Sequence, residues 1–359
     1  MKLGFGLYRH MLNVDHYRFA KQCGATHIVA HMVDYFNAFS KLGKDANQPI
    51  GGKLGWGRTG TVNPYWTVEE LYTLKTGIEA QGLELAAIEN LDPAIWYDIL
   101  LDGPRRSEQI EIVQNIIRRM GEVGIPCLGY NFSIAGVYGR VEGPFSRGEA
   151  PSVGMNGEVD QDPIPNGMVW NMVYDSHPAK GEISWFSHEE LWRRLEAFLQ
   201  EILPVAEEAG VTLAAHPDDP PVPVLRNTPR LVYQPHMYQR LLDVVPSPSN
   251  ALEFCLGSLA EMTEGDVHEA TETYARQQKI AYIHFRNVRG KVPQYKETFV
   301  DDGDIDMIRI LRILKEYNFQ GVLIPDHTPH MHCDAPWYAG MAYAMGYMKG
   351  VLGAVGKSE

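Results

Sequence analysis

Short apolar runs of strand length alternate along the chain with longer stretches in which apolar residues recur at helical spacing. A run of this kind predicts a buried strand, and the amphipathic stretch after it predicts a helix that covers the sheet. Eight such runs occur, at residues 3–7, 26–31, 83–89, 126–132, 211–216, 251–255, 280–285 and 321–325. The alternation predicts an α/β fold with a parallel sheet, and eight units predict a closed (β/α)8 barrel, the TIM barrel.

Two of the predicted helices carry a start signal. Thr67-Val68-Glu69-Glu70 and Ser187-His188-Glu189-Glu190 have the capping-box spacing, in which a hydroxyl and a carboxylate satisfy free amides of the first turn. Further helices are predicted near residues 14–23, 105–123, 235–245, 266–277, 305–317 and 336–351. No Gly-x-Gly-x-x-Gly motif follows the first strand, which favours the closed barrel over an open dinucleotide-binding sheet.

Residues 133–186 interrupt this regular pattern after the fourth strand. The segment is rich in Gly, Pro, Asn and Asp and carries several Trp and Tyr residues. Because the alternation resumes beyond it, we interpret the segment as an insertion within a single barrel that spans residues 1–359. It predicts either a lid over the pocket mouth or a contact surface in a homo-oligomer.

Composition and charge narrow the class of protein. The chain has 45% hydrophobic and 21% charged residues, an ordinary globular composition, and its formal net charge of −13 argues against a nucleic-acid partner. No window approaches the roughly 18 consecutive apolar residues of a membrane span. The four cysteines are far apart and form no Cys-x-x-Cys pair. We therefore expect a cytoplasmic protein with reduced thiols and a small-molecule ligand.

Four late strands end in residues that bind metals. In a barrel of this type the active site forms at the carboxyl ends of the strands. His216, Cys255, His284 and Asp326 hold that position, so their side chains are expected to converge. Taken alone, each residue has an ordinary structural explanation, but the shared position favours a site for one divalent ion.

Other polar residues near the strand ends are candidates for catalysis. His327 follows Asp326 and is our leading general acid or base, because its reference pKa lies near operating pH. Glu89 ends the third strand and is a second catalytic candidate. Arg286 closely follows His284 and predicts a bidentate contact with a substrate carboxylate.

Further residues of this kind predict substrate binding. Asn131 ends the fourth strand, and Asn287 lies beside Arg286. Asp218 and Asp219 follow His216 in a loop stiffened by proline, where they either orient that ligand, bind substrate hydroxyls or simply build a turn.

These motifs together resemble the D-mannonate dehydratases, a family of the xylose-isomerase-like barrel superfamily. The most specific is His-Pro-Asp-Asp-Pro-Pro at 216–221, and others are Glu-Asn at 89–90, Tyr-Asn-Phe at 130–132, His-Phe-Arg-Asn at 284–287, Gly-Asp-Ile-Asp-Met at 303–307 and Pro-Asp-His at 325–327. The resemblance implies that Mn(II) or Fe(II) is bound by the four strand-end ligands, whereas ligand softness alone favours Zn(II). It also implies removal of water from a sugar acid to give a 2-keto-3-deoxy acid.

The substrate-binding positions depart from the family pattern. Ile324 stands where the family has an arginine, and the segment 137–140 keeps only Arg140 of the family's Asp-Trp-Thr-Arg. A family tyrosine implicated in catalysis corresponds to Met341, with Tyr338 and Tyr343 nearby. Arg140 is therefore a substrate-binding candidate, and Tyr343 a catalytic one.

Three functions follow from these observations. The first is a metal-dependent lyase that dehydrates D-mannonate or a related aldonate, which Arg140 and Arg286 favour because they match an acidic substrate. The second is a metal-dependent sugar isomerase or epimerase on the same barrel. The third is a non-catalytic sugar-binding relative, consistent with the missing tyrosine.

Overall fold

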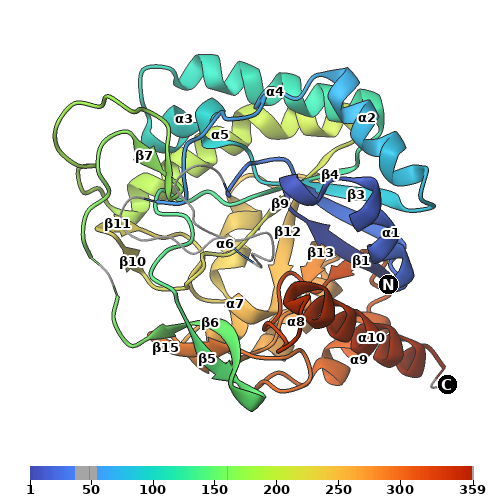
Figure 1. The fold of residues 1–359 in the computed structure, drawn as a ribbon. Helices are drawn as coiled ribbons and strands as arrows, with labels where there is room; N and C mark the ends of the chain where they lie inside the picture. The colour runs from blue at the N-terminus through green and yellow to red at the C-terminus, as the bar shows by residue number, and fades with distance from the viewer. Residues whose placement is uncertain (37–47, 49–54, 160, 358–359) are drawn as a thin grey trace.

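Eight parallel strands close into a barrel, and helices lie around it (Figure 1). The computed structural model describes residues 1–36, 48, 55–159 and 161–357. Around the barrel the strands follow chain order: β1 (Lys2–Leu7), β2 (His27–His31), β3 (Glu84–Glu89), β4 (Cys127–Tyr130), β9 (Thr212–Ala215), β12 (Asn250–Cys255), β13 (Ile280–His284) and β16 (Val322–Ile324). The predicted (β/α)8 fold is confirmed, and each predicted strand overlaps an observed one.

The helices begin close to the positions that the sequence signals predict. They are α1 (Val14–Gln22), α2 (Val68–Glu79), α3 (Tyr97–Leu101), α4 (Arg106–Val123), α5 (His188–Ala209), α6 (Met237–Val244), α7 (Leu256–Glu261), α8 (Val267–Arg276), α9 (Met307–Glu316) and α10 (Pro336–Lys357). The capping box at Thr67 is complete. At Ser187 only the first half forms, because the Glu190 carboxylate instead binds Arg193 and Arg194. None of the helices that the structure describes is long and apolar enough to cross a membrane.

The insertion at residues 133–186 contains strands, which the sequence pattern does not predict. Its strands are β5 (Val141–Ser146), β6 (Ala150–Asn156), β7 (Met168–Val169) and β8 (Met172–Val173). After β13 the chain forms a hairpin of β14 (Val288–Lys291) and β15 (Gln294–Glu297), and β15 pairs with β6. The resulting antiparallel sheet, in the order β14-β15-β6-β5, joins the insertion to the loop that follows β13.

Smaller elements complete the described chain. A short hairpin of β10 (Val224–Leu225) and β11 (Thr228–Pro229) follows β9, and 3-10 turns lie at Arg9–Met11, Pro93–Ile95 and Arg147–Glu149. The main hydrophobic core lies between the strands and the helices, as expected for a barrel. All four cysteines are free thiols.

Candidate active site

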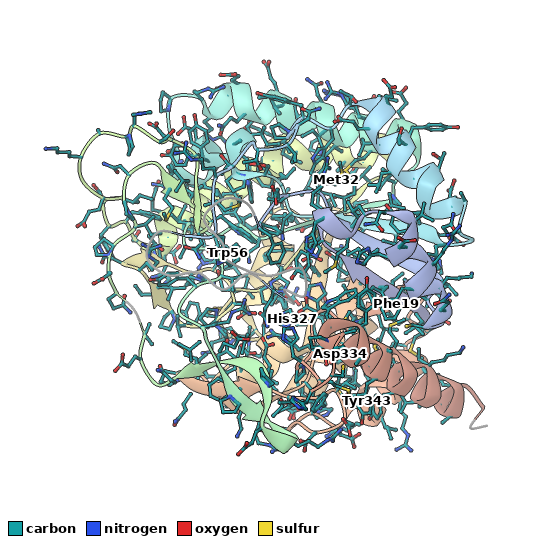
Figure 2. All side chains as sticks on the ribbon, in the orientation of Figure 1. Phe19, Met32, Trp56, His327, Asp334 and Tyr343 are labelled. Atoms are coloured by element: carbon teal, nitrogen blue, oxygen red, sulfur yellow. The ribbon has the colours of Figure 1, made fainter. Side chains whose placement is uncertain are left out.

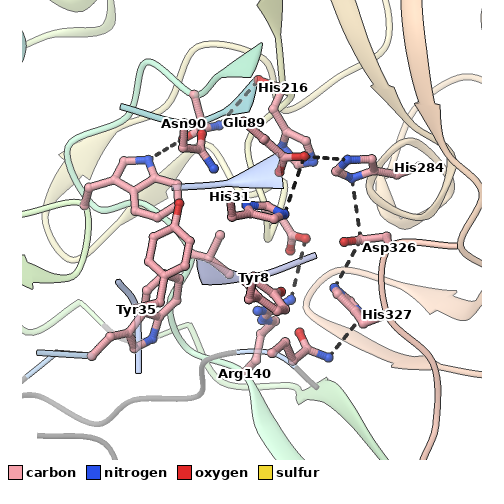
Figure 3. A pocket seen from close by; sticks show the side chains of 16 residues that line it. Tyr8, His31, Tyr35, Glu89, Asn90, Arg140, His216, His284, Asp326 and His327 are labelled. Carbon is pink, nitrogen blue, oxygen red and sulfur yellow. Dashed lines mark hydrogen bonds and ion pairs between the residues drawn. The ribbon is translucent and has the colours of Figure 1, made fainter. Parts of the chain in front are cut away.

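A cavity lies at the carboxyl ends of the barrel strands (Figure 3). The strands contribute polar side chains to its floor, and loops supply aromatic side chains to its walls. The lining residues are Tyr8, His31, Tyr35, Gln48, Trp56, Glu89, Asn90, Asn131, Val137, Arg140, Trp170, His216, Asp219, His284, Asp326 and His327. Eight of the residues predicted from the sequence are among them: Glu89, Asn131, Arg140, His216, Asp219, His284, Asp326 and His327.

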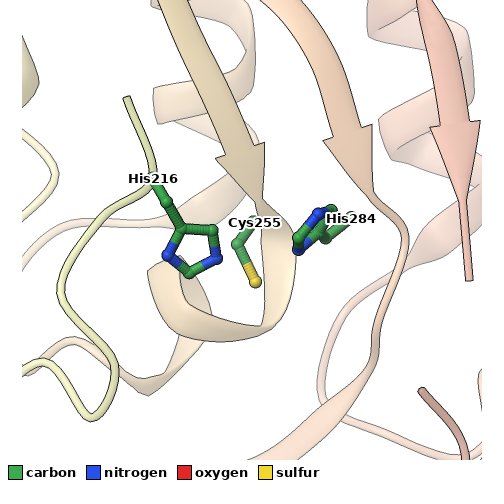
Figure 4. Close-up of side chains that lie close together, drawn as sticks. All are labelled: His216, Cys255 and His284. Carbon is green, nitrogen blue, oxygen red and sulfur yellow. The ribbon is translucent and has the colours of Figure 1, made fainter. Parts of the chain in front are cut away.

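The structure brings His216, Cys255 and His284 together (Figure 4). Each offers a ligand atom, and these atoms all lie within 4.8 Å of one another. The strands explain the convergence, because Cys255 and His284 are register partners at the ends of β12 and β13, while His216 directly follows β9. Such a cluster of two imidazoles and a sulfur is a typical ligand set for a divalent transition metal.

The remaining hydrogen bonds of the two histidines leave ligand atoms available. Nδ1 of His216 lies 2.6 Å from the carbonyl oxygen of Pro217, and since a carbonyl only accepts, Nδ1 carries the proton and Nε2 is left for a metal. Nδ1 of His284 is buried without a hydrogen-bond partner among the described residues. It faces Asp326 Oδ2 at 3.5 Å. The donor set therefore fits one divalent ion.

Asp326 lies beside this cluster but outside the 4.8 Å group. Its backbone has a φ of 61°, the left-handed region that few residues other than Gly, Asn and Asp adopt. Strict strand alternation would send His327 to the opposite face from Asp326. The left-handed turn breaks that alternation, so both side chains line the pocket and Asp326 Oδ2 lies 3.2 Å from Nε2 of His327.

Two buried carboxylates hold His284 from the opposite side. Its Nε2 lies 3.2 Å from Glu89 and 3.2 Å from Glu253, and both carboxylates lie inside the barrel. Gly129 makes this arrangement possible, because a Cβ there would lie 2.4 Å from Glu253 Oε2. Carboxylates that orient a metal-binding histidine through its other nitrogen are common in metal sites. The sequence does not predict Glu253, because the prediction considers only residues at the strand ends and Glu253 lies two residues before the end of β12.

The charges of the site favour a thiolate. Burial by itself raises the pKa of the Cys255 thiol, but the Arg286 charge and hydrogen bonds with His216 and His284 hold it well below its usual range. Burial likewise lowers the pKa of His216, but the bond to Cys255 and the Glu253 charge raise it to about 9. Protons on these histidines compete with a metal for the same lone pairs, so metal binding releases them.

Glu297, which the sequence does not predict as a site residue, holds the ring of His327 through Nδ1. This nitrogen lies 2.8 Å from Glu297 Oε2 and 3.2 Å from Gln48 Nε2. Burial raises the pKa of Glu297, but the charges of His327 and Arg286 hold it well below its usual range. Glu297 ends β15, in a hairpin outside the barrel repeat, so the strand-end rule cannot find it.

Arg140 carries a positive charge into the pocket from the insertion (Figure 3). It lies 3.7 Å from Asp219 and 3.5 Å from Glu297, beyond ordinary hydrogen-bond length. Its side chain is only 6% exposed. A buried guanidinium held at this distance from its carboxylates keeps donors available for a bound anion.

Arg286 does not line the pocket, contrary to its predicted contact with a substrate carboxylate. Its guanidinium is buried behind Cys255, where it contacts the sulfur at 3.4 Å and Asp219 at 3.0 Å. Glu261 and Glu297 also pair with it. The guanidinium is therefore occupied by protein groups and closed to a ligand in the cavity.

Cys255 lies next to two of the lining histidines but does not itself line the pocket, and three other predicted residues lie outside it. Asp218 is buried against Arg230 at 2.6 Å and accepts two backbone amides. Asn287 donates to the carbonyls of residues 300 and 305 and holds that loop. Tyr343 lies on α10, apart from His327 (Figure 2), and accepts a hydrogen bond from Arg147 at 2.9 Å.

Aromatic residues that the sequence prediction does not include form the outer wall. Tyr35, Trp56 and Trp170 pack with ring centroids 5.5 to 5.6 Å apart. Tyr8 stacks on His31 at 4.7 Å. Tyr8 and His31 stand at the ends of β1 and β2, so the strand-end rule reaches them, whereas nothing in the local sequence places the two tryptophans.

Known proteins resemble this chain over most of its length. The model of the D-mannonate dehydratase (UxuA) family matches residues 57–144 and 181–359. A mannonate dehydratase of Streptococcus equi subsp. zooepidemicus is 33% identical over 318 residues, which cover 83% of this chain and 86% of that protein. The crystal structure of mannonate dehydratase from Streptococcus suis serotype 2 has a TM-score of 0.74 at 27% identity and covers 99% of this chain and 93% of that one.

A more distant structure shares only the fold. The xylose isomerase domain protein from Planctomyces limnophilus has a TM-score of 0.58 at 14% identity, over 100% of both chains. The family match includes the strand-end cluster and Arg140, whereas Tyr8, His31, Trp56 and Trp170 lie outside the matched ranges.

Proposed function

This chain belongs to the D-mannonate dehydratase family, and we propose that its pocket removes water from D-mannonate to give a 2-keto-3-deoxy acid with the help of one bound divalent ion. The chain is thus a hydro-lyase. The observation that carries the proposal is the geometry of one cavity, in which the cluster of His216, Cys255 and His284 and the guanidinium of Arg140 line or adjoin the same space.

Arg140 is the proposed partner of the substrate carboxylate. Its guanidinium reaches the cavity, and its contacts with Asp219 and Glu297 are long enough to leave donors free for an anion. Asp219 and Asn131 line the same cavity and are proposed to contact substrate hydroxyls. An acidic sugar matches this combination of a fixed guanidinium and several polar groups.

His216, Cys255, His284 and Asp326 are the proposed ligands of the ion. When bound, the ion supplies Lewis-acid polarisation of the substrate carboxylate, which makes the neighbouring carbon-bound proton more acidic. The mixed nitrogen, sulfur and oxygen set suits Mn(II), Fe(II) or Zn(II). Among these, the family resemblance favours Mn(II) or Fe(II).

His327 is the proposed acid or base. Loss of water needs a base for the proton beside the carboxylate and an acid for the leaving hydroxyl. The bond from Nδ1 to Glu297 fixes the ring, so Nε2 is the atom that faces Asp326 and the cavity. Glu89 also lines the cavity but is engaged by His284, at 3.2 Å, which makes it the second candidate.

Incubation of the purified protein with Mn(II) and a panel of aldonates and ketoses tests the function. We expect D-mannonate to be converted to a 2-keto-3-deoxy acid, detected by NMR of the product mixture. Interconversion of ketoses without loss of water would identify an isomerase or epimerase, and sugar binding without turnover would identify a non-catalytic relative. Either outcome would contradict the proposal.

A further inference from the structure

The sulfur of Cys255 accepts hydrogen bonds from two buried residues that are not among the proposed metal ligands, Ser258 and Arg286. Ser258 supplies two of the donors: its backbone N–H lies 3.5 Å from Sγ and its hydroxyl 3.2 Å from Sγ. Nη2 of Arg286 is the third, at 3.4 Å. All three residues are buried. A ligand sulfur thus has three fixed donors from the protein.

Arg286 is held at the sulfur by several buried polar groups. Its Nη2 also contacts Ser258 Oγ at 3.1 Å and Asp219 at 3.0 Å, while Nη1 pairs with Glu261 at 3.4 Å. Gly257 leaves the space for it, since a Cβ there would lie 2.6 Å from Arg286 Nε. The guanidinium therefore has one position, and that position is behind the sulfur.

We propose that Ser258 and Arg286 are positioning residues for the metal ligand Cys255, and that their hydrogen bonds make its sulfur a weaker donor and so reduce the preference of the site for softer ions. The inference rests on Cys255 being a ligand, as proposed above. Hydrogen bonds to a ligand sulfur withdraw electron density from it and tune the bound metal. Thiolates bind Zn(II) and Co(II) more strongly than Mn(II). A weakened thiolate therefore reduces the difference in affinity between these ions.

The Co(II)-loaded protein tests this inference without any activity measurement. Coordinated thiolate gives a sulfur-to-cobalt charge-transfer band. Ser258→Ala removes the hydroxyl donor, so we expect the band to move to longer wavelength. The ratio of the Mn(II) to the Zn(II) dissociation constant should rise about fivefold, the effect of losing one hydrogen bond. Ser258→Gly removes the same hydroxyl and serves if Ser258→Ala does not fold.

Ser249→Ala is the matched control, because this buried serine precedes β12 at the end of the strand opposite to Cys255. We expect its band and its metal ratio to equal those of the wild type. An unchanged band and ratio in Ser258→Ala would overturn the inference while leaving the ligand assignment intact. A wild-type Co(II) protein without the band would overturn the ligand assignment itself and the inference with it.

Discussion

At the proposed metal site, His216, Cys255 and His284 come from the ends of neighbouring barrel strands. The aromatic part of the lining instead takes Trp56 from the long connection between β2 and α2, and Trp170 from the turn between β7 and β8. The first group is held by strand register and by buried carboxylates. The second is held by ring packing and by single hydrogen bonds, such as the one from Trp170 to Asn131 at 3.1 Å. On the proposed function, the reaction therefore depends mainly on residues at the strand ends, and the fit of the substrate depends also on residues outside the barrel strands.

The family comparison separates the strand-end cluster from the two tryptophans. The matched ranges contain the strand-end cluster, while the aromatic wall lies outside them. We infer that changes on the metal side abolish the reaction, whereas changes on the loop side alter which sugar acid is accepted and how tightly it is held.

Cys255→Ser should have the largest effect, because a serine hydroxyl is a poor ligand at neutral pH. Loss of the ion removes several kcal/mol of transition-state stabilisation, so D-mannonate turnover should fall by about 10³-fold or more. Metal content measured by elemental analysis should fall with it. Cys23→Ser changes a thiol far from the strand ends and should keep both metal and activity; equal occupancy in the two variants would contradict the assignment.

His327→Ala should have the next largest effect. Turnover should fall by about 10²- to 10⁴-fold, the usual contribution of a general acid or base. Metal content should remain at the wild-type level, which separates this variant from Cys255→Ser. His330→Ala is the control, since His330 is close in sequence but does not line the cavity. Wild-type turnover by His327→Ala would transfer the role to Glu89.

Arg140→Met should mainly weaken substrate binding. Charge-assisted hydrogen bonds contribute about 1.5–3 kcal/mol, so KM for D-mannonate should rise about 10- to 100-fold. Arg147→Met removes another arginine of the insertion, one that pairs with Asp301 away from the cavity, and should leave KM unchanged. Steady-state kinetics with the metal-loaded protein distinguish these results, and an unchanged KM in Arg140→Met would exclude a carboxylate contact.

Trp170→Phe should have the smallest effect, because it removes one hydrogen bond and keeps an aromatic ring in the wall. The free energy of unfolding should fall by about 0.5–1.5 kcal/mol. Denaturant titration measures the change. Trp185→Phe is the control, as that side chain is 62% exposed. Equal stability of both variants would show that the bond to Asn131 does not hold the insertion against the barrel.

The part of the site that the sequence predicts is the part that depends on strand ends. Because parallel strands end at one level, His216, Cys255 and His284 can be placed together from the strand pattern alone. Arg286 shows where the same reasoning fails. Arg286 lies two residues after the end of β13, but its side chain does not enter the cavity. It occupies the space that Gly257 leaves open and contacts the sulfur of Cys255.

Positions fixed by long-range pairing could not be predicted. Glu297 reaches His327 because its strand, β15, pairs with β6 of the insertion. Neither strand has a clear alternating pattern, and glycine and proline in and around them predict loops. The left-handed backbone at Asp326, which turns His327 into the pocket, has no sequence signal beyond an aspartate that tolerates it.

X-ray diffraction from crystals soaked in Mn(II), with data collected at the manganese absorption edge, tests the central claim most directly. We expect one anomalous peak bounded by His216, Cys255, His284 and Asp326, with ligand atoms about 2.0–2.4 Å from the ion. A peak between Glu89 and Glu253 instead, or no peak in the cavity at saturating Mn(II), would contradict it.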